Sequence, residues 1–559
     1  MAKPKKKSKV VSQEEKKKYL VPKKDLFDKF DSFFEKKGKY VLWISGFLTL
    51  AFTLLLFNVR ISEGGDDSAY ILRAFDFVKE HIFPSFQGPL YPLMLSLFVW
   101  IFGINIFVLK FLSVIFIIVH LFLFYKAFYN KIPSFITAFV LFIIAFNASL
   151  LYYASQTYSE VFFMMLQAAL FYYFFKYIIE KQGSSIKNYL ILGLLLLLLG
   201  LTRTIGYSAL LAVLIYLLTD KKWKGALITL AGFIVFYLVI ELIKRVFFGS
   251  HSNQYQGQLG ILLQVDPYDP SKGIENFKGF LERFWGNSNL YLSKHIYASL
   301  GLKADITKTS AFMTAFTYIL FFVSFIVSVR KNKYLAFTGI YLLTLIGATF
   351  FMLQTRWDQD RLILIFLPLI LVFITSGFYY LLKLKRLRIF KFLLPLIFVM
   401  LFFTSLKVMI EKVTDNNDVL VNSIAGNQFY GMTPDWINYI KMSQWAGKNL
   451  PDTANIACRK ASISFIYGKR KFFGITSVPS EDADTLLNNL KKNKISYVLM
   501  GSLRMNPKQK TEYTITTIKR YLYFIQQKYP QALSLVNTIG TDEQAYMFKI
   551  NYDKAVKPK

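Results

Sequence analysis

Two adjacent acids, Asp66 and Asp67, form the densest polar signal in a very apolar chain, within the run Ser62-Glu63-Gly64-Gly65-Asp66-Asp67-Ser68-Ala69-Tyr70. A carboxylate in such a run can accept a proton as a general base, bind a divalent cation, or cap the helix that follows. Capping needs only one side-chain oxygen, so two neighbouring acids leave one of them free for chemistry. This run is therefore the first candidate site.

Two arginines are candidates for binding an anion, because a guanidinium binds phosphate oxygens through two parallel N–H groups. Arg203 lies between two apolar runs, where an unpaired cation is costly and tends to be functional. The alternative is that its side chain simply extends to water at the membrane interface. Arg361 lies close to Arg356, Asp358 and Asp360, so a surface cluster of ion pairs is the alternative there.

Metal sites built on histidine or cysteine are not indicated. The four histidines, His81, His120, His251 and His295, show no HExxH or paired spacing. The single cysteine, Cys458, allows neither an intramolecular disulfide nor a cysteine-based cluster. A divalent cation held by Asp66, Asp67 and Glu63 through oxygen ligands stays open at this point.

The composition shows what kind of element must position these residues. Of the 559 residues 54% are hydrophobic and only 18% are charged, which is too apolar for a water-soluble surface and predicts an integral membrane protein. The net charge of +33 fits cytoplasmic loops that face anionic lipid better than it fits nucleic-acid binding.

Eleven apolar segments are predicted to cross the membrane as helices. They are 40–59, 106–126, 133–151, 158–179, 187–201, 205–219, 225–248, 310–329, 334–353, 361–382 and 389–409. The stretch Pro89 to Phe102 is short for a span and is predicted to be a re-entrant or surface helix. The weakest region is 187–219, where two short crossings flank Thr202-Arg203-Thr204.

Lysine and arginine next to short loops set the orientation of such a chain. Five basic loops alternate with mixed or acidic ones, and we expect them to face the cytoplasm: Lys126 to Lys131, Glu180 to Lys187, Asp220 to Lys224, Arg330 to Lys333 and Lys383 to Lys391. The N-terminus is then cytoplasmic, and an odd number of crossings leaves 411–559 outside a cytoplasmic membrane.

Three domains follow from this pattern. Residues 1–39, with 14 Lys and 6 acids, are predicted to be a cytoplasmic basic tail, and 40–410 a transmembrane domain with an outer loop at 60–105. A small extracytoplasmic α/β domain is predicted for 411–559. Its predicted strands are Ile463 to Tyr467, Ser496 to Met500 and Ala545 to Ile550, and its predicted helices are Trp436 to Asn449, Glu481 to Asn493 and Thr511 to Tyr529.

Two further loops carry expectations. A helix is predicted after Asp67, in the membrane interface, with Arg73, Asp76 and Glu80 on its polar face. The loop 249–309, which contains Asp266-Pro-Tyr-Asp-Pro270 and Trp285, is long enough for a lid or acceptor platform and equally suits a packed scaffold.

The order of several motifs resembles a known family. Asp66-Asp67-Ser-Ala-Tyr70 follows the first span, Gly88-Pro89-Leu90-Tyr91-Pro92-Leu93 comes about 20 residues later, and Phe102-Gly103-Ile104-Asn105 leads into the next span. Together with Leu201-Thr202-Arg203 and the segment from Arg361 to Pro368, these motifs resemble the lipid-linked-sugar glycosyltransferases of GT-C architecture, in the protein O-mannosyltransferase and aminoarabinose transferase group. The chain departs from that pattern at Asp67, where Glu is usual, at Phe86-Gln87, where Glu-Lys is frequent, and at Gly88, where Pro is usual.

The resemblance implies an inverting transfer of a sugar from a polyprenyl-phosphate donor to a hydroxyl of a glycan, lipid or protein acceptor at the outer face of the membrane. Asp66 would be the base, with Asp67 also catalytic, and Arg203 and Arg361 would bind the donor phosphate. Tyr70 and Tyr91 are possible substrate contacts. The resemblance favours metal-independent transfer, so no cofactor is expected, and the expected partners are the donor, the acceptor and membrane lipids.

The alternative function is a multi-span transporter or flippase of lipid-linked substrates. Only the number of predicted spans supports this alternative. Such proteins usually show internal repeats and broken spans in corresponding halves, and the sequence shows no such symmetry.

Overall fold

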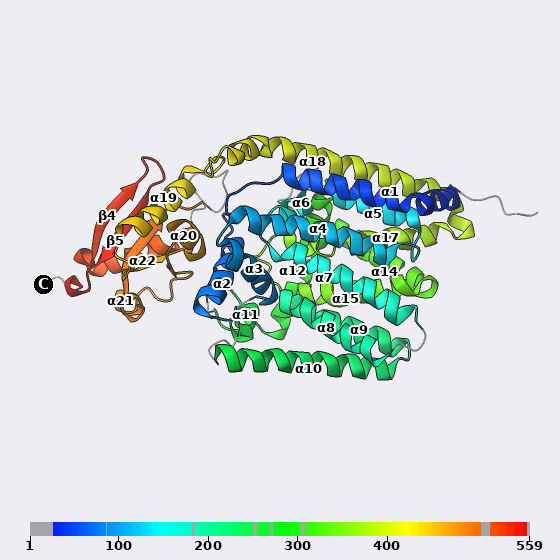
Figure 1. Cartoon of the computed structure of the whole chain (residues 1–559), viewed down its shortest axis with the longest axis horizontal. Coiled ribbons are helices and arrows are strands. Elements are labelled where there is room, and N and C mark those ends of the chain that lie inside the picture. The colour runs from blue at the N-terminus through cyan, green and yellow to red at the C-terminus, as the bar shows by residue number, and fades with distance from the viewer. Residues whose placement is uncertain are drawn as a thin grey trace, which may run out of the picture.

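The computed structural model describes residues 26–559 except 85–86, 182–184, 250–253, 268, 270–271, 303–307, 505–514 and 556–559. The predicted basic tail therefore lies mostly outside the described residues. The first helix, α1 (Leu26–Leu55), begins inside that tail and ends near the predicted end of the first span. A long helical bundle follows, with a smaller mixed domain at one end of it (Figure 1).

The described part of the chain contains seven helices that are long and apolar enough to cross a membrane. These seven spans correspond to α1, α4 (Ile106–Phe128), α7 (Ser159–Phe174), α10 (Trp223–Phe248), α14 (Ala311–Lys331), α15 (Lys333–Met352) and α18 (Leu393–Ile424). The pair α5 (Ser134–Phe146) and α6 (Ala148–Ala154) forms one further span, bent by 66°. Four shorter apolar helices are α3 (Leu90–Phe102), α8 (Ile186–Thr202), α9 (Ser208–Thr219) and α17 (Leu367–Leu382). Each predicted crossing coincides with one of these helices or with the bent pair, so the multi-span helical fold is confirmed.

The bend between α5 and α6 has a local cause at Asn147. Its Oδ1 accepts a hydrogen bond from the backbone N–H of Leu150 at 2.9 Å and so caps α6. Its Nδ2 donates to the carbonyl of Ser299 at 2.7 Å. The side chain thus satisfies the backbone groups that a broken helix exposes inside an apolar bundle.

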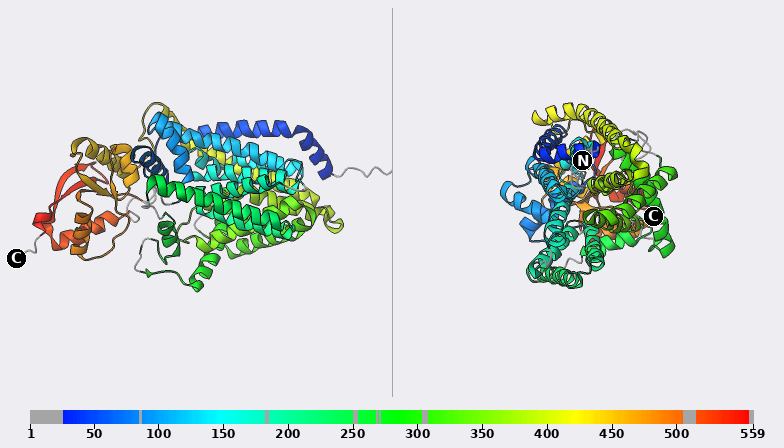
Figure 2. Two further views of the ribbon diagram at one scale, coloured as in Figure 1. Left: turned by 60° about the horizontal axis from the view of Figure 1, so that its bottom comes forward. Right: turned by 90° about the vertical axis from the view of Figure 1, so that its right-hand side faces the viewer.

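The predicted basic loops meet at one end of the bundle, here called the basic end. Contacts between them include the Lys131–Glu180 ion pair, the hydrogen bonds from Asn332 to the Lys131 carbonyl and from Lys222 to the Ile178 carbonyl, and the Lys383–Asp28 pair. The smaller domain lies at the opposite end, here called the domain end, in Figure 1 and in the left view of Figure 2. Because α1 begins at the basic end and the smaller domain lies at the domain end, the chain must cross the bundle an odd number of times, counting α1, before it enters that domain.

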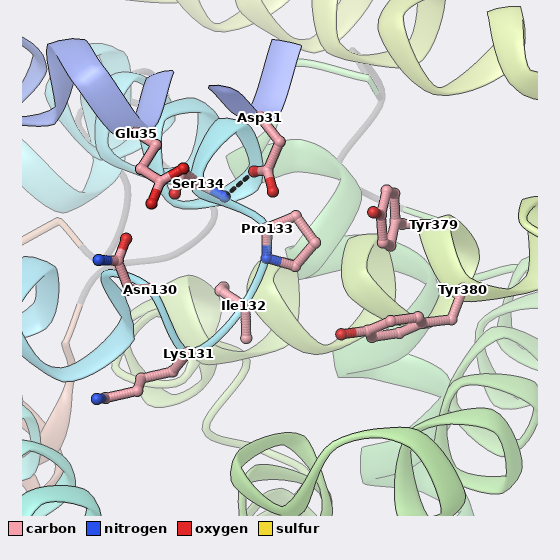
Figure 3. A pocket seen from close by; sticks show the side chains of 9 residues that line it. All are labelled: Asp31, Glu35, Asn130, Lys131, Ile132, Pro133, Ser134, Tyr379 and Tyr380. Atoms are coloured by element: carbon pink, nitrogen blue, oxygen red, sulfur yellow. Dashed lines mark hydrogen bonds between the residues drawn. The ribbon is translucent and has the colours of Figure 1, made fainter. Parts of the chain in front are cut away.

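A pocket of about 330 Å³ opens at the basic end, between α1, the α4–α5 loop and α17 (Figure 3). Asp31 of α1 accepts a hydrogen bond there from the backbone N–H of Ser134, the first residue of α5. A carboxylate at a helix N-terminus is stabilising. Asp31 therefore fastens α1 to α5, far from the candidate acids at the domain end.

Two short helices precede α4 at the domain end. The helix α2 (Asp66–Glu80) begins at the candidate acids, and α3 (Leu90–Phe102) is the short apolar helix predicted from its length. Three side chains at the end of α3, Trp100, Ile101 and Phe102, are exposed. Such a face suits lipid contact, which agrees with a re-entrant or surface helix.

The loop between α10 and α14 contains α11 (Gln254–Leu263), α12 (Phe277–Leu290) and the single turn α13 (Ile296–Ser299). Asn287 of α12 donates hydrogen bonds to the carbonyls of Phe350 and Leu353 at the end of α15, at 2.9 and 2.7 Å. Arg283 donates to the carbonyl of Leu262 in α11 at 2.6 Å. These buried contacts support the scaffold alternative for this loop, although Trp285 is exposed.

The C-terminal domain is a mixed α/β unit, as predicted. It contains α19 (Pro434–Asn449), β1 (Asn455–Cys458), α20 (Ala461–Gly468), β2 (Phe473–Gly474), α21 (Ala483–Lys492), β3 (Ile495–Gly501), α22 (Thr517–Lys528), β4 (Leu533–Ile539) and β5 (Ala545–Ile550). The sheet order is β2-β1-β3-β5-β4, with β1 parallel to β2 and β3, and β5 antiparallel to β3 and β4. The helix α18 continues to Ile424, beyond the predicted end of the last span at 409.

One predicted strand is wrong. Residues 463–467 belong to helix α20, whereas the predicted strands at 496–500 and 545–550 correspond to β3 and β5. A run of five apolar residues does not distinguish a buried strand from a buried helix. Tertiary packing decides here, because Ile463, Phe465 and Ile466 are all buried and the Phe465 ring lies against Phe75 of α2 at 5.0 Å.

Candidate functional site

Asp66 meets Arg361 at the domain end of the bundle. The Nη2 of Arg361 donates to the Oδ2 of Asp66 at 2.5 Å, across 295 positions of sequence. The N-cap of α2 is Gly65, which lies in the left-handed region with φ of +87°. Asp66 is therefore not the N-cap residue, and its side chain does not cap the helix. The Asp66 and Arg361 side chains are 31% and 18% exposed, so the pair is partly buried and remains partly accessible.

Arg361 is held from several directions. It is the first residue of the short helix α16 (Arg361–Leu364), and its Nε donates to the Oε1 of Gln359 at 2.7 Å. Its guanidinium also lies over the ring of Tyr158, 5.3 Å from the centroid. Two carboxylates, Asp66 and Glu160, lie against the guanidinium. Because a guanidinium stays protonated in proteins, the group is a fixed positive charge.

Glu160 joins the two predicted arginines. Its Oε1 is 2.7 Å from the Nη1 of Arg203 and 3.5 Å from the Nη1 of Arg361, and its side chain is only 2% exposed. Arg203 also donates to the Oγ of Ser159 at 3.2 Å. Arg203 therefore turns into the protein instead of extending to water. Sequence reasoning missed Glu160, although an acid in the first turn of an apolar span is itself a functional signal.

Asp67 has a different environment from Asp66. It is completely buried, with Oδ2 accepting from the N–H of Ser62 and Oδ1 from the N–H of Ser68, both at 2.7 Å. Burial raises its pKa, while these two N–H groups and nearby Lys110 oppose that rise. Both oxygens thus stabilise the loop that precedes α2. This geometry favours a positioning role, and catalysis by Asp67 stays a prediction.

The two predicted tyrosines lie behind the acids. The Tyr70 hydroxyl is 3.1 Å from the Oγ of Ser159, and the Tyr70 and Tyr91 rings meet edge to face at 5.1 Å. Both residues are buried, and the Tyr91 hydroxyl has no hydrogen-bond partner among the described residues. Substrate contact by either one stays a prediction.

In the described part of the chain, the charged side chains of residues 356–361 reach partners in other segments. Arg356 pairs with Asp266 at 3.0 Å, and Asp358 pairs with Lys294 and with His295. Asp360 accepts from the hydroxyl of Tyr153 at 2.9 Å. Each of these side chains has a separate partner, and of the two arginines it is Arg361 that reaches Asp66.

The three acids of the first loop do not gather as cation ligands. Among the residues that the structure describes, no group of three His, Cys, Asp or Glu side chains could hold a metal ion. The oxygens of Asp67 are directed to backbone N–H groups, and the Asp66 carboxylate is directed to Arg361.

Gly88, where the family usually has proline, has a steric role. A Cβ at this position would lie 2.1 Å from the Thr202 carbonyl oxygen and 2.4 Å from that of Leu201. Two of the predicted motifs therefore touch, and the contact fixes the end of α8 just before Arg203. A larger residue would have to displace that backbone.

We expect Gly88→Ala to destabilise the protein by about 1 to 3 kcal/mol and to lower turnover, because the end of α8 must shift and Arg203 moves with it. Thermal unfolding and turnover of the detergent-purified protein measure both effects. Gly46→Ala in α1 is the matched control, since a Cβ there meets nothing within 4 Å. Equal unfolding temperatures for the two variants would show that the close approach is not needed.

Comparison with solved structures supports the fold. The chain matches the crystal structure of ArnT from Cupriavidus metallidurans bound to undecaprenyl phosphate with a TM-score of 0.52 and 10% identity, over 94% of this chain and 100% of that one. The apo structure of the same protein gives 0.49 and 12%, over 94% and 100%. An oligosaccharyltransferase from Archaeoglobus fulgidus, tethered to an acceptor peptide, gives 0.48 and 11%, over 92% and 74%.

No family model matches the sequence, and no curated protein matches it significantly. The fold is therefore established by structure alone, at an identity too low for sequence comparison to detect. The chain is a multi-pass membrane protein with the GT-C fold that its motifs predicted, like that of ArnT.

Proposed function

We propose that this protein is a membrane glycosyltransferase that moves a sugar from a polyprenyl-phosphate donor to an acceptor hydroxyl. The observation that carries the proposal is the meeting of Asp66 with Arg361, joined through Glu160 to Arg203, at the domain end of the bundle. The Asp66 carboxylate next to the Arg361 guanidinium supplies a proton acceptor and an anion site within a few ångströms of each other, and Glu160 links Arg203 to that pair. This transfer needs both groups.

The proposed reaction is a single displacement. The acceptor oxygen attacks the anomeric carbon while its proton passes to Asp66, a new C–O bond forms, and the bond from that carbon to the phosphate oxygen breaks. The product is the inverted glycoside, and the leaving group is the polyprenyl monophosphate. Because a phosphodiester becomes a monoester, negative charge grows on its oxygens as the bond breaks.

Arg361 and Arg203 are proposed to bind those oxygens. Two carboxylates, Asp66 and Glu160, hold Arg361 in the structure, and a phosphate offers a similar pair of anionic oxygens. A donor phosphate that engages Arg361 would replace Asp66 on the guanidinium. The Asp66 carboxylate is then free to accept the acceptor's proton, so donor binding and base activation are coupled.

The comparison adds support for the donor class. ArnT, whose fold this chain shares, was crystallised with undecaprenyl phosphate. The transporter alternative gains no comparable observation, since the described charged residues of this site converge at one end of the bundle and do not line a path through it.

Transfer is tested with the purified protein in lipid nanodiscs and a panel of polyprenyl-phosphate sugars, with a short-chain alcohol or glycan as acceptor. We expect release of polyprenyl monophosphate with at least one donor, and a glycoside of inverted anomeric configuration. Movement of the intact labelled lipid between leaflets, with no cleavage of any donor, would favour the transporter alternative instead.

The proposed orientation places the basic end in the cytoplasm and the C-terminal domain outside. Native Cys458 is fully buried and is unsuitable as a label site. We therefore expect a membrane-impermeant maleimide to label Tyr523→Cys on α22 in intact cells, and to label Lys385→Cys only after permeabilisation. Both positions are exposed. The reverse pattern would invert the topology.

A further inference from the structure

The C-terminal domain is docked directly on the helix that carries Asp66. Phe465 packs on Phe75, and Lys471 pairs with Asp76 at 3.0 Å and with Glu80. These contacts cover the polar face of α2, which the sequence predicted to lie in the membrane interface. The domain therefore packs directly on α2.

From the C-terminal domain, Lys460 reaches the turn that precedes the candidate base; it lies in the loop between β1 and α20. Its Nζ donates to the carbonyl oxygens of Glu63 and Gly64, at 3.1 and 2.9 Å. These carbonyls belong to the two residues just before Gly65, whose positive φ turns the chain into α2. One ammonium group therefore holds the turn that presents Asp66.

Lys460 is itself held in place from its own domain. Its backbone N–H donates to the hydroxyl of Tyr439 at 3.1 Å, and its ammonium lies 5.8 Å from the centre of the Trp436 ring. Next to it, the hydroxyls of Ser462 and Ser68 are 2.8 Å apart, and Ser68 also donates to the Gly65 carbonyl at 2.8 Å. The turn is thus connected to the C-terminal domain on both sides of Gly65.

We propose that Lys460 is a positioning residue for the transfer reaction: its ammonium clamps the Glu63 and Gly64 carbonyls, so that the turn directs Asp66 toward Arg361. This inference rests on the proposed function and assigns the C-terminal domain a part in it. Lys460 touches backbone and no reacting atom, so its effect on catalysis is exerted through the geometry of Asp66.

The protonation state of Lys460 gives the clamp a pH dependence. Burial and the adjacent Arg459 lower the pKa of Lys460 to about 8, while Asp66, Asp67 and Glu63 oppose that shift. From the side of the C-terminal domain, Tyr439 also faces it. The charged ammonium prevails below this pKa and is lost as the pH rises through it. The clamp, and with it the activity, is therefore expected to weaken on the alkaline side.

The test compares Lys460→Met, which keeps the aliphatic stem, and Lys460→Arg, which stays charged at high pH. Lys441→Met is the matched control, because Lys441 is an exposed lysine on α19 of the same domain. Hydrogen–deuterium exchange over residues 62–69 is measured without donor, and kcat and donor KM are measured across pH 6 to 10. All four proteins are first checked for equal monodispersity in detergent.

We expect Lys460→Met to speed exchange over 62–69 and to lower kcat by about 10- to 100-fold, the cost typical of a misplaced catalytic group, with donor KM little changed. Lys460→Arg should retain most activity and move the alkaline limb of the pH profile upward. If Lys460 had only a structural role, Lys460→Arg would leave the alkaline limb of the pH profile unchanged.

Unchanged exchange in Lys460→Met, or an alkaline limb in Lys460→Arg identical to that of the wild-type protein, would overturn the proposal. Because exchange needs no donor, it reports on the clamp separately from the reaction. A wild-type protein that cleaves no donor would refute the proposed function, whereas unchanged exchange would refute the clamp alone.

Discussion

Asp66→Asn is expected to lower turnover by at least about 100-fold, the contribution typical of a general base. Asparagine keeps the size and one oxygen of the side chain but cannot accept the proton from the acceptor hydroxyl. Folding should survive, because Asp66 is partly exposed and Arg361 keeps Glu160 as a partner in the variant. Single-turnover transfer from the donor identified in the nanodisc panel is the measurement.

Asp67→Asn is the matched comparison, one residue away and with the same chemical change. Both oxygens of Asp67 accept backbone N–H groups, and an amide places its NH₂ against one of those donors. Lys110 also loses a buried carboxylate nearby. We expect a loss of stability, on the order of the 3 to 5 kcal/mol seen when a buried pair is broken. Full activity in Asp66→Asn with none in a folded Asp67→Asn would reverse the assignment within the pair, and activity in both would refute the mechanism.

Arg361→Lys is expected to impair transfer by at least about tenfold, although it keeps the positive charge. Preorganised donors at the site of developing charge typically supply effects of this size or larger. The guanidinium contacts Asp66, Glu160 and Gln359 through three different nitrogens, and a lysine cannot reproduce that planar geometry. Donor affinity and turnover should both fall, and Arg203→Lys should behave in the same way.

Arg356→Lys is the control for that experiment. Arg356 is 62% exposed and pairs with Asp266, so the change is expected to cost between 0 and about 1 kcal/mol of stability and to leave turnover intact. If Arg361→Lys and Arg203→Lys were both as active as Arg356→Lys, and bound the donor as well, the donor phosphate would have to be held by other residues.

The sequence determined almost completely which segments form the helices of the bundle. An apolar run of span length can only be a helix in lipid, because every backbone polar group must be satisfied within the segment. All predicted crossings are therefore helices, including the two short ones that flank Arg203. The distribution of Lys and Arg indicated which loops lie together, and the contacts from Lys131 to Glu180 and from Lys383 to Asp28 confirm their common end.

Motif order was a reliable guide to the fold, and it selected three residues that the structure places close together. Asp66, Arg203 and Arg361 were predicted from separate segments, and the structure brings all three together around Glu160. What the motifs could not do is separate the roles of Asp66 and Asp67. The sequence shows two identical side chains, and only the turn at Gly65 directs one toward Arg361 and the other toward buried backbone N–H groups.

The tertiary structure showed which further residues lie at the proposed site. Glu160 is an acid in the first turn of an apolar helix, a signal that sequence reasoning missed, whereas Lys460 is one of many lysines in a basic chain and forms no local pattern. Helix α20 was predicted as a strand for the same reason: a short apolar run specifies burial but not the partner that provides it. In the folded protein residues 463–467 form a helix that packs on α19 and α2, and Lys460, just before it, reaches the carbonyls of Glu63 and Gly64. Hydropathy and charge are local properties of the sequence, so they predict the helices and the loops. Contacts between segments some 400 residues apart depend on how the surfaces of the folded segments fit together, so they cannot be predicted from local patterns.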